Sequence, residues 1–226
     1  MSDGPYETLR AAVLGFEFVP GEKLSERGLE EFLGASRTPI RAALVRLENE
    51  GLTGRVGRGW RVAPIDLAEV RAVTEHREVV ETGALALAVE RATPAELAAV
   101  RALLEAEPVA DDEESGLRGG SDFHLALVRL SRNPFLVEAL NGTLTRLART
   151  RWLEVRTAAS REQARAEHRG ILDAVEARDA DRAAELLRAH SRGTAERLLA
   201  HLAQERRRLR GRGFSIVESS TAPPAL

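Results

Sequence analysis

The chain has 226 residues, of which 43% are hydrophobic, and its 33 basic and 35 acidic side chains give a net charge of −2. This balance gives no overall attraction to nucleic acid, and the absence of cysteine excludes disulfides, thiolate metal sites and cysteine nucleophiles. No apolar run approaches the roughly 18 residues of a membrane span, and the N-terminus lacks the basic and apolar regions of a signal peptide. We therefore expect a cytoplasmic protein without a membrane partner.

Residues 6–49 have the pattern of three short helices. Apolar residues at helical spacing predict the first helix over 6–14. The second begins after Ser25, a good N-cap, and ends near Gly34, a natural left-handed terminator. The third begins only two residues later at Ser36 and carries a continuous apolar stripe. The short connection between the last two helices predicts a helix-turn-helix.

A β-hairpin is predicted directly after the third helix. Two short runs, 52–56 and 60–62, flank the glycine-bounded tip Gly57-Arg58-Gly59. A helix-turn-helix followed at once by a hairpin is the winged form of the motif. We therefore place a winged helix-turn-helix DNA-binding domain at residues 1–64.

The remainder of the chain reads as helix with short breaks. The tail is rich in Gly, Ser, Thr and Pro, which predicts disorder over 210–226. The fold class is therefore mostly α, with an antiparallel helical bundle over 65–209. Its six helices are predicted over 67–91, 95–106, 122–131, 134–158, 161–178 and 180–208.

Arginines gather on and after the third helix. Between residues 37 and 61 there are six arginines and two glutamates. Because the apolar stripe points inward, Arg37, Thr38 and Arg41 are expected on the exposed edge of the first turn and a half, where a recognition helix meets base edges. Arginine suits this place because its fork can donate twice to guanine O6 and N7.

Three sequence runs closely resemble the GntR-family winged helix. They are PGEKLSE at 20–26, LGASRTPIRAAL at 33–44 and LENEGL at 47–52, and Glu30 stands where the family usually carries alanine. The resemblance covers nearly all of the first 64 residues and implies a regulator that binds operator DNA. The residues expected to contact DNA are Arg27, Ser36, Arg37, Thr38, Arg41, Gly57, Arg58 and Gly59.

Three of the five histidines, His124, His168 and His190, lie on apolar faces of predicted helices. A single inward histidine is usually a core residue. Three of them on three helices of one bundle can share a metal ion, since imidazole is the commonest protein metal ligand. His76 and His201 belong to no such set and are expected at the surface.

Arg77 lies within the inward stripe of the helix predicted over 67–91. A buried cation needs a partner. Glu81, one turn further on, can form an internal pair with it, or an incoming carboxylate can bind it bidentately. The spacing alone leaves both interpretations open.

Several runs of the helical bundle resemble the FCD effector domain of FadR-type regulators, in its six-helix VanR-like branch. The likeness spans about 67–208 and implies that the three histidines hold a divalent metal, such as Zn, Ni or Mn, which helps to bind an organic acid. In the family an aspartate joins the three histidines as the fourth metal ligand, and its position here is Gly120. The fourth ligand is then missing, or Asp122 supplies it after local unwinding, or water or the effector replaces it. The matching runs are 77–81 (REVVE), 122–124 (DFH), 131–134 (SRNP), 167–169 (EHR) and 189–190 (AH).

We therefore expect a homodimeric transcription regulator, a repressor controlled by a small carboxylate effector that binds at Arg77 and Glu81. Its operator should be a short inverted repeat, because a dimer places two recognition helices about 34–36 Å apart. We do not expect an enzyme. The alternatives are a metal-dependent hydrolase that uses the three histidines with Glu78 or Glu81 as acid or base, and a DNA-binding dimer that is insensitive to effectors.

Overall fold

The computed structural model describes residues 4–106, 113–151 and 157–219. The chain divides into two compact units, one made of Met1–Val70 with Leu202–Leu226 and the other of Arg71–His201. The predicted fold class is confirmed, with a small winged unit and a helical unit. The unit boundaries fall inside two long helices, so the helical ends of the second unit continue into the first.

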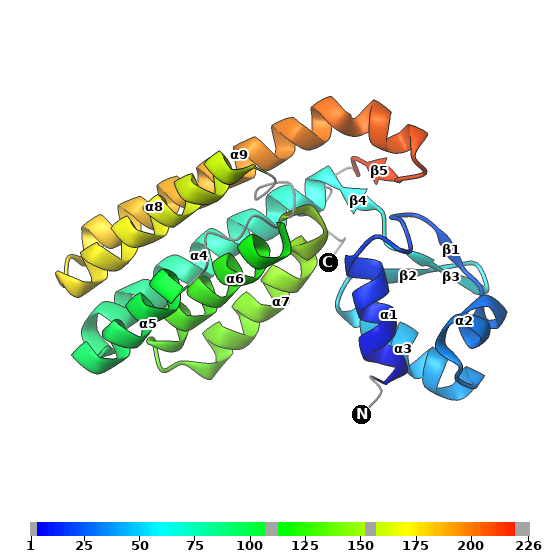
Figure 1. Cartoon of the computed structure of the whole chain (residues 1–226), viewed down its shortest axis with the longest axis horizontal. Helices are drawn as coiled ribbons and strands as arrows, with labels where there is room; N and C mark the ends of the chain where they lie inside the picture. Colours follow the sequence, from blue (N-terminus) through cyan, green and yellow to red (C-terminus); the bar gives the residue numbers. More distant parts are fainter. Residues whose placement is uncertain (1–3, 107–112, 152–156, 220–226) are drawn as a thin grey trace, which may run out of the picture. The chain divides into compact units, whose positions relative to one another are not determined.

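The winged unit begins with three helices, α1 (Pro5–Leu14), α2 (Glu26–Leu33) and α3 (Arg37–Asn49) (Figure 1). The start of α2 is fixed by Ser25, whose hydroxyl accepts a hydrogen bond from the Gly28 N–H at 3.0 Å. Its end is fixed by Gly34, which adopts φ 60°, a conformation that glycine reaches at little cost. The helix-turn-helix is therefore set by these local signals, as the sequence predicts.

A small sheet completes the winged unit. Strands β2 (Thr53–Val56) and β3 (Gly59–Val62) form the predicted hairpin, with Gly54 opposite Arg61. A strand that was not predicted, β1 (Lys23–Leu24), pairs antiparallel with β3, so the order is β1-β3-β2. The core below contains one apolar cluster from all three helices and the sheet: Leu9, Val13, Leu24, Leu29, Ile40, Leu44, Leu47, Leu52, Trp60 and Val62.

The disorder predicted over 210–226 is wrong for the part that the structure describes. Strand β5 (Ile216–Val217) pairs in parallel with β4 (Ile65–Asp66). Ile216 is completely buried, and the ring of Phe214 lies 5.3 Å from that of Phe16. The prediction weighed the polar composition of the tail and overlooked these two apolar anchors. Residues 220–226 lie outside the described residues.

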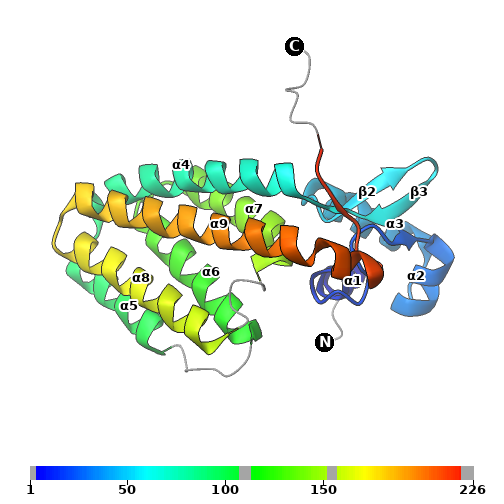
Figure 2. The ribbon, with the colours of Figure 1, turned by 90° about the horizontal axis from the view of Figure 1, so that it is seen from above.

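The helical unit is built on six helices within the described residues, lying side by side in Figures 1 and 2. Its core is made of apolar side chains from all six helices. None of the described helices is long and apolar enough to cross a membrane. The helices are α4 (Leu67–Arg91), α5 (Pro94–Ala106), α6 (Glu113–Arg129), α7 (Pro134–Arg151), α8 (Ala158–Glu176) and α9 (Ala180–Gly211).

Two boundaries in this unit differ from the prediction. Helix α6 begins at Glu113, within the gap left between the helices predicted over 95–106 and 122–131. Negative charge favours the N-terminus of a helix, so acids there are compatible with a helix start. The helix predicted over 134–158 ends as α7 at Arg151, and Thr157 instead caps α8 through a hydrogen bond from the Ser160 N–H. Residues 152–156 lie outside the described residues.

Candidate functional site

The eight residues predicted to contact DNA are all exposed in the winged unit. On α3, the stripe that includes Ile40 and Leu44 is buried in the core, and Arg37 and Arg41 lie on the opposite edge. Ser36 precedes the helix without using its side chain as a cap. An open helix N-terminus with a hydroxyl beside it is suited to a phosphate. The predicted edge is thus available to a duplex.

Two acids on α2 contact these arginines. Arg41 donates from Nε and Nη2 to the carboxylate of Glu26, at 2.7 and 2.9 Å. Arg37 donates from Nε to Glu30 at 3.2 Å. The hydrogen bond from Arg41 lowers the pKa of Glu26 and raises that of Arg41, so this pair is ionised at neutral pH. Sequence reasoning missed these contacts, because they join two helices.

The remaining predicted DNA contacts lie on α2 and at the hairpin tip. Arg27 is widely exposed, and its Nε lies 3.6 Å from Glu31. Arg58 is exposed in the turn between β2 and β3. Nearby, the guanidinium of Arg55 lies 3.7 Å from the centre of the Trp60 ring, which holds it on the sheet.

The helical unit brings the three predicted histidines together. His124 comes from α6, His168 from α8 and His190 from α9, and they are 1%, 3% and 6% exposed. One nitrogen from each ring can be chosen so that all three lie within 4.8 Å of one another. The ring centres are 4.8 to 5.2 Å apart. Periodicity predicted that these residues face inward, and the packing of the helices makes them a cluster.

Neighbouring side chains fix the histidine rings. His190 Nδ1 lies 2.6 Å from Glu167 Oε2, so the carboxylate accepts this hydrogen bond and Nε2 is left toward the cluster. The ring of Phe123 stacks on that of His168 at 4.3 Å. These contacts orient two of the three imidazoles, and Glu81 Oε2, 3.2 Å from His124 Nδ1, orients the third.

Arg77 and Glu81 are both buried in α4 and pair with each other. Arg77 Nε donates to Glu81 at 2.9 Å, and Arg77 Nη2 lies 2.6 Å from His124 Nε2. Burial favours a neutral Glu81, but the charge of Arg77 outweighs it and holds the pKa of this carboxyl below its ordinary value. Burial, aided by the charge of Arg77, lowers the pKa of His124 to about 3, so its imidazole is neutral at pH 7. Of the two interpretations of Arg77, the structure shows the internal pair.

The structure does not bring Asp122 to the histidines. Asp122 is exposed and lies outside the cluster, whereas Gly120 is buried. The helix runs unbroken through both positions, so a residue two places before His124 points to the other side. The local unwinding that would have turned it inward is absent from this described segment. His76 is exposed as expected, and His201 is half-buried.

The histidine cluster fits a divalent metal ion. It offers one imidazole nitrogen from each of three helices, with that of His124 becoming available when Arg77 Nη2 leaves His124 Nε2. Zinc and its neighbours in the first transition row accept such a ligand set, with water or an added ligand in the open position. No described carboxylate belongs to the cluster. His124, His168 and His190 are therefore the residues that would hold the ion.

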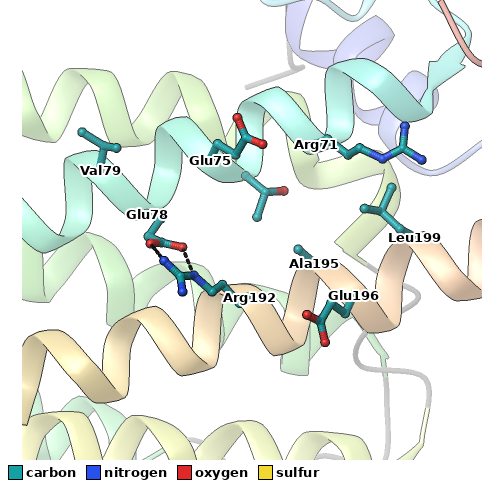
Figure 3. A pocket seen from close by; sticks show the side chains of 9 residues that line it. Arg71, Glu75, Glu78, Val79, Arg192, Ala195, Glu196 and Leu199 are labelled. Carbon is teal, nitrogen blue, oxygen red and sulfur yellow. Dashed lines mark hydrogen bonds and ion pairs between the residues drawn. The ribbon is translucent and has the colours of Figure 1, made fainter.

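A separate groove of about 440 Å³ lies between α4 and α9 (Figure 3). Glu78 and Arg192 face each other there and form two hydrogen bonds of 2.7 and 2.9 Å. Glu78, a candidate acid or base for a hydrolase, is thus bound to an arginine in this groove. The other candidate, Glu81, is held by Arg77. Glu81 also reaches the cluster, since its Oε2 lies 3.2 Å from His124 Nδ1, whereas the two hydrogen bonds of Glu78 hold it to Arg192.

Comparison with known proteins gives two family matches. Residues 3–62 match the model of bacterial regulatory proteins of the gntR family, and residues 72–193 match the FCD domain. The Nta operon transcriptional regulator of Aminobacter aminovorans is 31% identical over 180 residues, which are 78% of this chain and 84% of that protein. An uncharacterized HTH-type transcriptional regulator in an unstable DNA locus of Streptomyces ambofaciens is 34% identical over 87% of this chain and 85% of its own length. Among solved structures, E. coli McbR/YncC is 25% identical, with a TM-score of 0.71 over 87% of this chain and 96% of that one.

Proposed function

The chain belongs to the GntR family of bacterial regulatory proteins and carries an FCD domain, and on this premise we propose that it is a repressor whose affinity for DNA is controlled by a small carboxylate. The carboxylate binds beside a metal ion held by His124, His168 and His190. The proposal that the protein binds operator DNA rests on the exposed edge of α3 that carries Arg37 and Arg41. The proposal that an effector controls it rests on the buried histidine cluster beside Arg77.

Arg37 and Arg41 read base edges in the major groove. Both are exposed in the first turn and a half of α3, and an arginine fork matches guanine O6 and N7, which is worth about 1–3 kcal/mol of discrimination for each good pair. Ser36 and Thr38 contact phosphates at the helix N-terminus, and Arg58 reaches the duplex from the hairpin. The protein acts as a homodimer on an inverted repeat, because two recognition helices one helical turn apart read two half-sites.

The effector site uses Arg77 as its charged anchor. His124, His168 and His190 would hold a divalent ion, which would supply a Lewis-acidic position for carboxylate oxygens. The buried guanidinium of Arg77 adds a positive charge 2.6 Å from one of these imidazoles. A carboxylate can displace one of the present contacts of Arg77 and satisfy the same donors. The site therefore selects small anions.

Coupling to DNA follows from the chain path. Arg77 lies on α4 and His190 on α9, and each of these helices has residues in both units. Effector binding that favours one arrangement of these helices shifts DNA affinity by the difference in its affinity for the two states, typically about 1–3 kcal/mol. An effector that weakens operator binding makes the protein a repressor that is released by its ligand.

The DNA half is tested by selecting a duplex from a randomized library and measuring binding of variants to it. Arg37→Ala and Arg41→Ala should lower the ratio of specific to non-specific affinity, because each removes a base contact. Arg188→Ala removes one exposed charge from the helical unit and should leave this ratio unchanged. A ratio that is the same in all four proteins would show that α3 does not read the sequence.

The effector half is tested by thermal stability with added organic acids, in the presence of Zn²⁺, Ni²⁺ or Mn²⁺. A carboxylate that binds should raise the melting temperature of the metal-loaded protein and weaken operator binding in the same concentration range. The same compounds should have no effect on a His168→Ala variant. Operator binding that no acid alters would instead favour a DNA-binding dimer without an effector.

A further inference from the structure

The contacts between α2 and α3 form a regular double pair. The two acids, Glu26 and Glu30, are four residues apart on α2, and the two arginines, Arg37 and Arg41, are four residues apart on α3. The first acid meets the second arginine and the second acid meets the first arginine. Residues four apart share one face of a helix, so α2 presents an acidic edge to the basic edge of its neighbour.

We propose that Glu30 is a positioning residue for base recognition, which holds the guanidinium of Arg37 so that its terminal nitrogens point toward the duplex. The inference rests on the proposed function of α3 as the recognition helix. It adds a residue that contacts no base and yet contributes to sequence preference.

The atoms involved support this role. Arg37 binds Glu30 through Nε, so this contact leaves Nη1 and Nη2 for the two acceptors of a guanine. Arg41 binds Glu26 through Nε and Nη2, which leaves both hydrogens of Nη1 and one of Nη2 beyond that pair. Each arginine is therefore held from its side, and its outer end remains available for hydrogen bonds.

The exposed fractions of the side chains also support this positioning role. Arg37 is 63% exposed and Glu30 is 31% exposed, so the acid lies deeper than the cation that it holds. The pair Arg41–Glu26 has the same order, at 62% and 26%. A long arginine side chain loses rotamer freedom when it binds a base, and a partner that has already restricted it reduces this cost.

A carboxylate near DNA also has an opposite effect, since it repels phosphate. Removing any acid from this surface raises affinity for all duplexes, because binding to the backbone depends on charge. Positioning and charge therefore make different predictions. Charge alone changes specific and non-specific binding together, whereas positioning changes their ratio.

The experiment compares Glu30→Gln with Glu31→Gln. Both remove one acid from α2, but Glu31 faces Arg27, at 3.6 Å, and does not hold an arginine of α3. Binding is measured to the duplex selected by the unaltered protein, to the same duplex with the guanine read by Arg37 replaced by adenine, and to a random duplex. The guanine is identified as the position whose replacement no longer matters in Arg37→Ala.

In Glu30→Gln the preference for guanine over adenine should fall by about two- to fivefold, the size expected for one exposed ion pair. In Glu31→Gln all three affinities should rise together and the preference should stay the same. Glu30→Gln added to Arg37→Ala should cause no further loss of preference. Unchanged melting temperatures show that neither variant alters the fold.

An unchanged guanine preference in Glu30→Gln would overturn the positioning role. If no position of the duplex loses its effect in Arg37→Ala, base reading by Arg37 is overturned instead, so the two failures are distinguishable. A preference that rises in Glu30→Gln would show that the acid masks Arg37, which also contradicts the proposal.

Discussion

His190 Nδ1 lies 2.6 Å from Glu167 Oε2, and this hydrogen bond joins α9 to α8 beside the buried histidine cluster. Helix α8 thus supplies both a histidine of the cluster, His168, and the carboxylate that orients another. A histidine whose Nδ1–H is held by a carboxylate presents the lone pair of Nε2, which is the tautomer that a metal ion requires. The geometry around His190 is therefore already set for coordination.

Replacing Glu167 with Gln should weaken metal binding by about 10- to 100-fold, because a partner that no longer carries a charge orients His190 less strongly and lowers its basicity. Metal affinity can be measured by competition with a chelating dye. Glu162→Gln is the matched control, since this acid lies on the same helix and pairs with exposed Arg169 at 2.6 Å. Equal affinities in the two variants would mean that Glu167 does not orient a ligand.

The identity of the ligands can be tested by metal content. Elemental analysis after loading with Zn²⁺ should give one ion per chain in the unaltered protein and much less in His168→Ala, which leaves only two of the three donors. Asp122→Ala should keep full metal content, because Asp122 is exposed and lies outside the cluster. Metal lost in Asp122→Ala but retained in His168→Ala would refute the three-histidine site.

The inward position of the three histidines could be predicted because each lies in an apolar stripe with the period of a helix. The helix-turn-helix could be predicted because Ser25 and Gly34 are strong local signals for the ends of α2. Both signals depend only on residues that are close in sequence. An apolar stripe predicts which face of a helix a residue occupies, but the partner that it contacts on that face depends on tertiary packing.

Most of the features that sequence reasoning missed depend on partners in other elements, and the start of α6 is the exception. The bond between His190 and Glu167 joins two helices, and the contacts of Glu26 and Glu30 with α3 depend on the angle between two helices. The strand β5 was missed because a two-residue strand has no period of its own, and Ile216 pairs with Ile65 at the start of the helical part of the chain. Local composition carries little information about such contacts.

The buried pair of Arg77 and Glu81 should be essential to the stability of the helical unit. Arg77→Met leaves the Glu81 carboxylate without its cation, and breaking a buried pair in this way typically costs about 3–5 kcal/mol. Urea unfolding followed by circular dichroism gives the free energy of unfolding. The double variant Arg77→Met/Glu81→Leu removes both charges and should recover most of the loss. A double variant less stable than the single one would show that the pair is not the cause.

The C-terminal segment should stabilise the winged unit through β5. Ile216 is completely buried, and replacing such a residue with alanine usually costs about 2–5 kcal/mol. Trp60, which is buried in the core of the winged unit, reports its unfolding by fluorescence when the second tryptophan is replaced by Trp152→Phe. In this background, Ile216→Ala and removal of residues 213–226 should each lower the urea midpoint seen by Trp60.

Removal of residues 220–226 alone is the control for this experiment. It keeps β5, the contact of Phe214 with Phe16 and the hydrogen bond from the Ser219 N–H to Asp66. Its midpoint should equal that of the full chain, because every contact that we hold responsible is still present. A loss of stability as large as that of the longer deletion would place the stabilising contacts beyond Ser219 and would refute the role of β5.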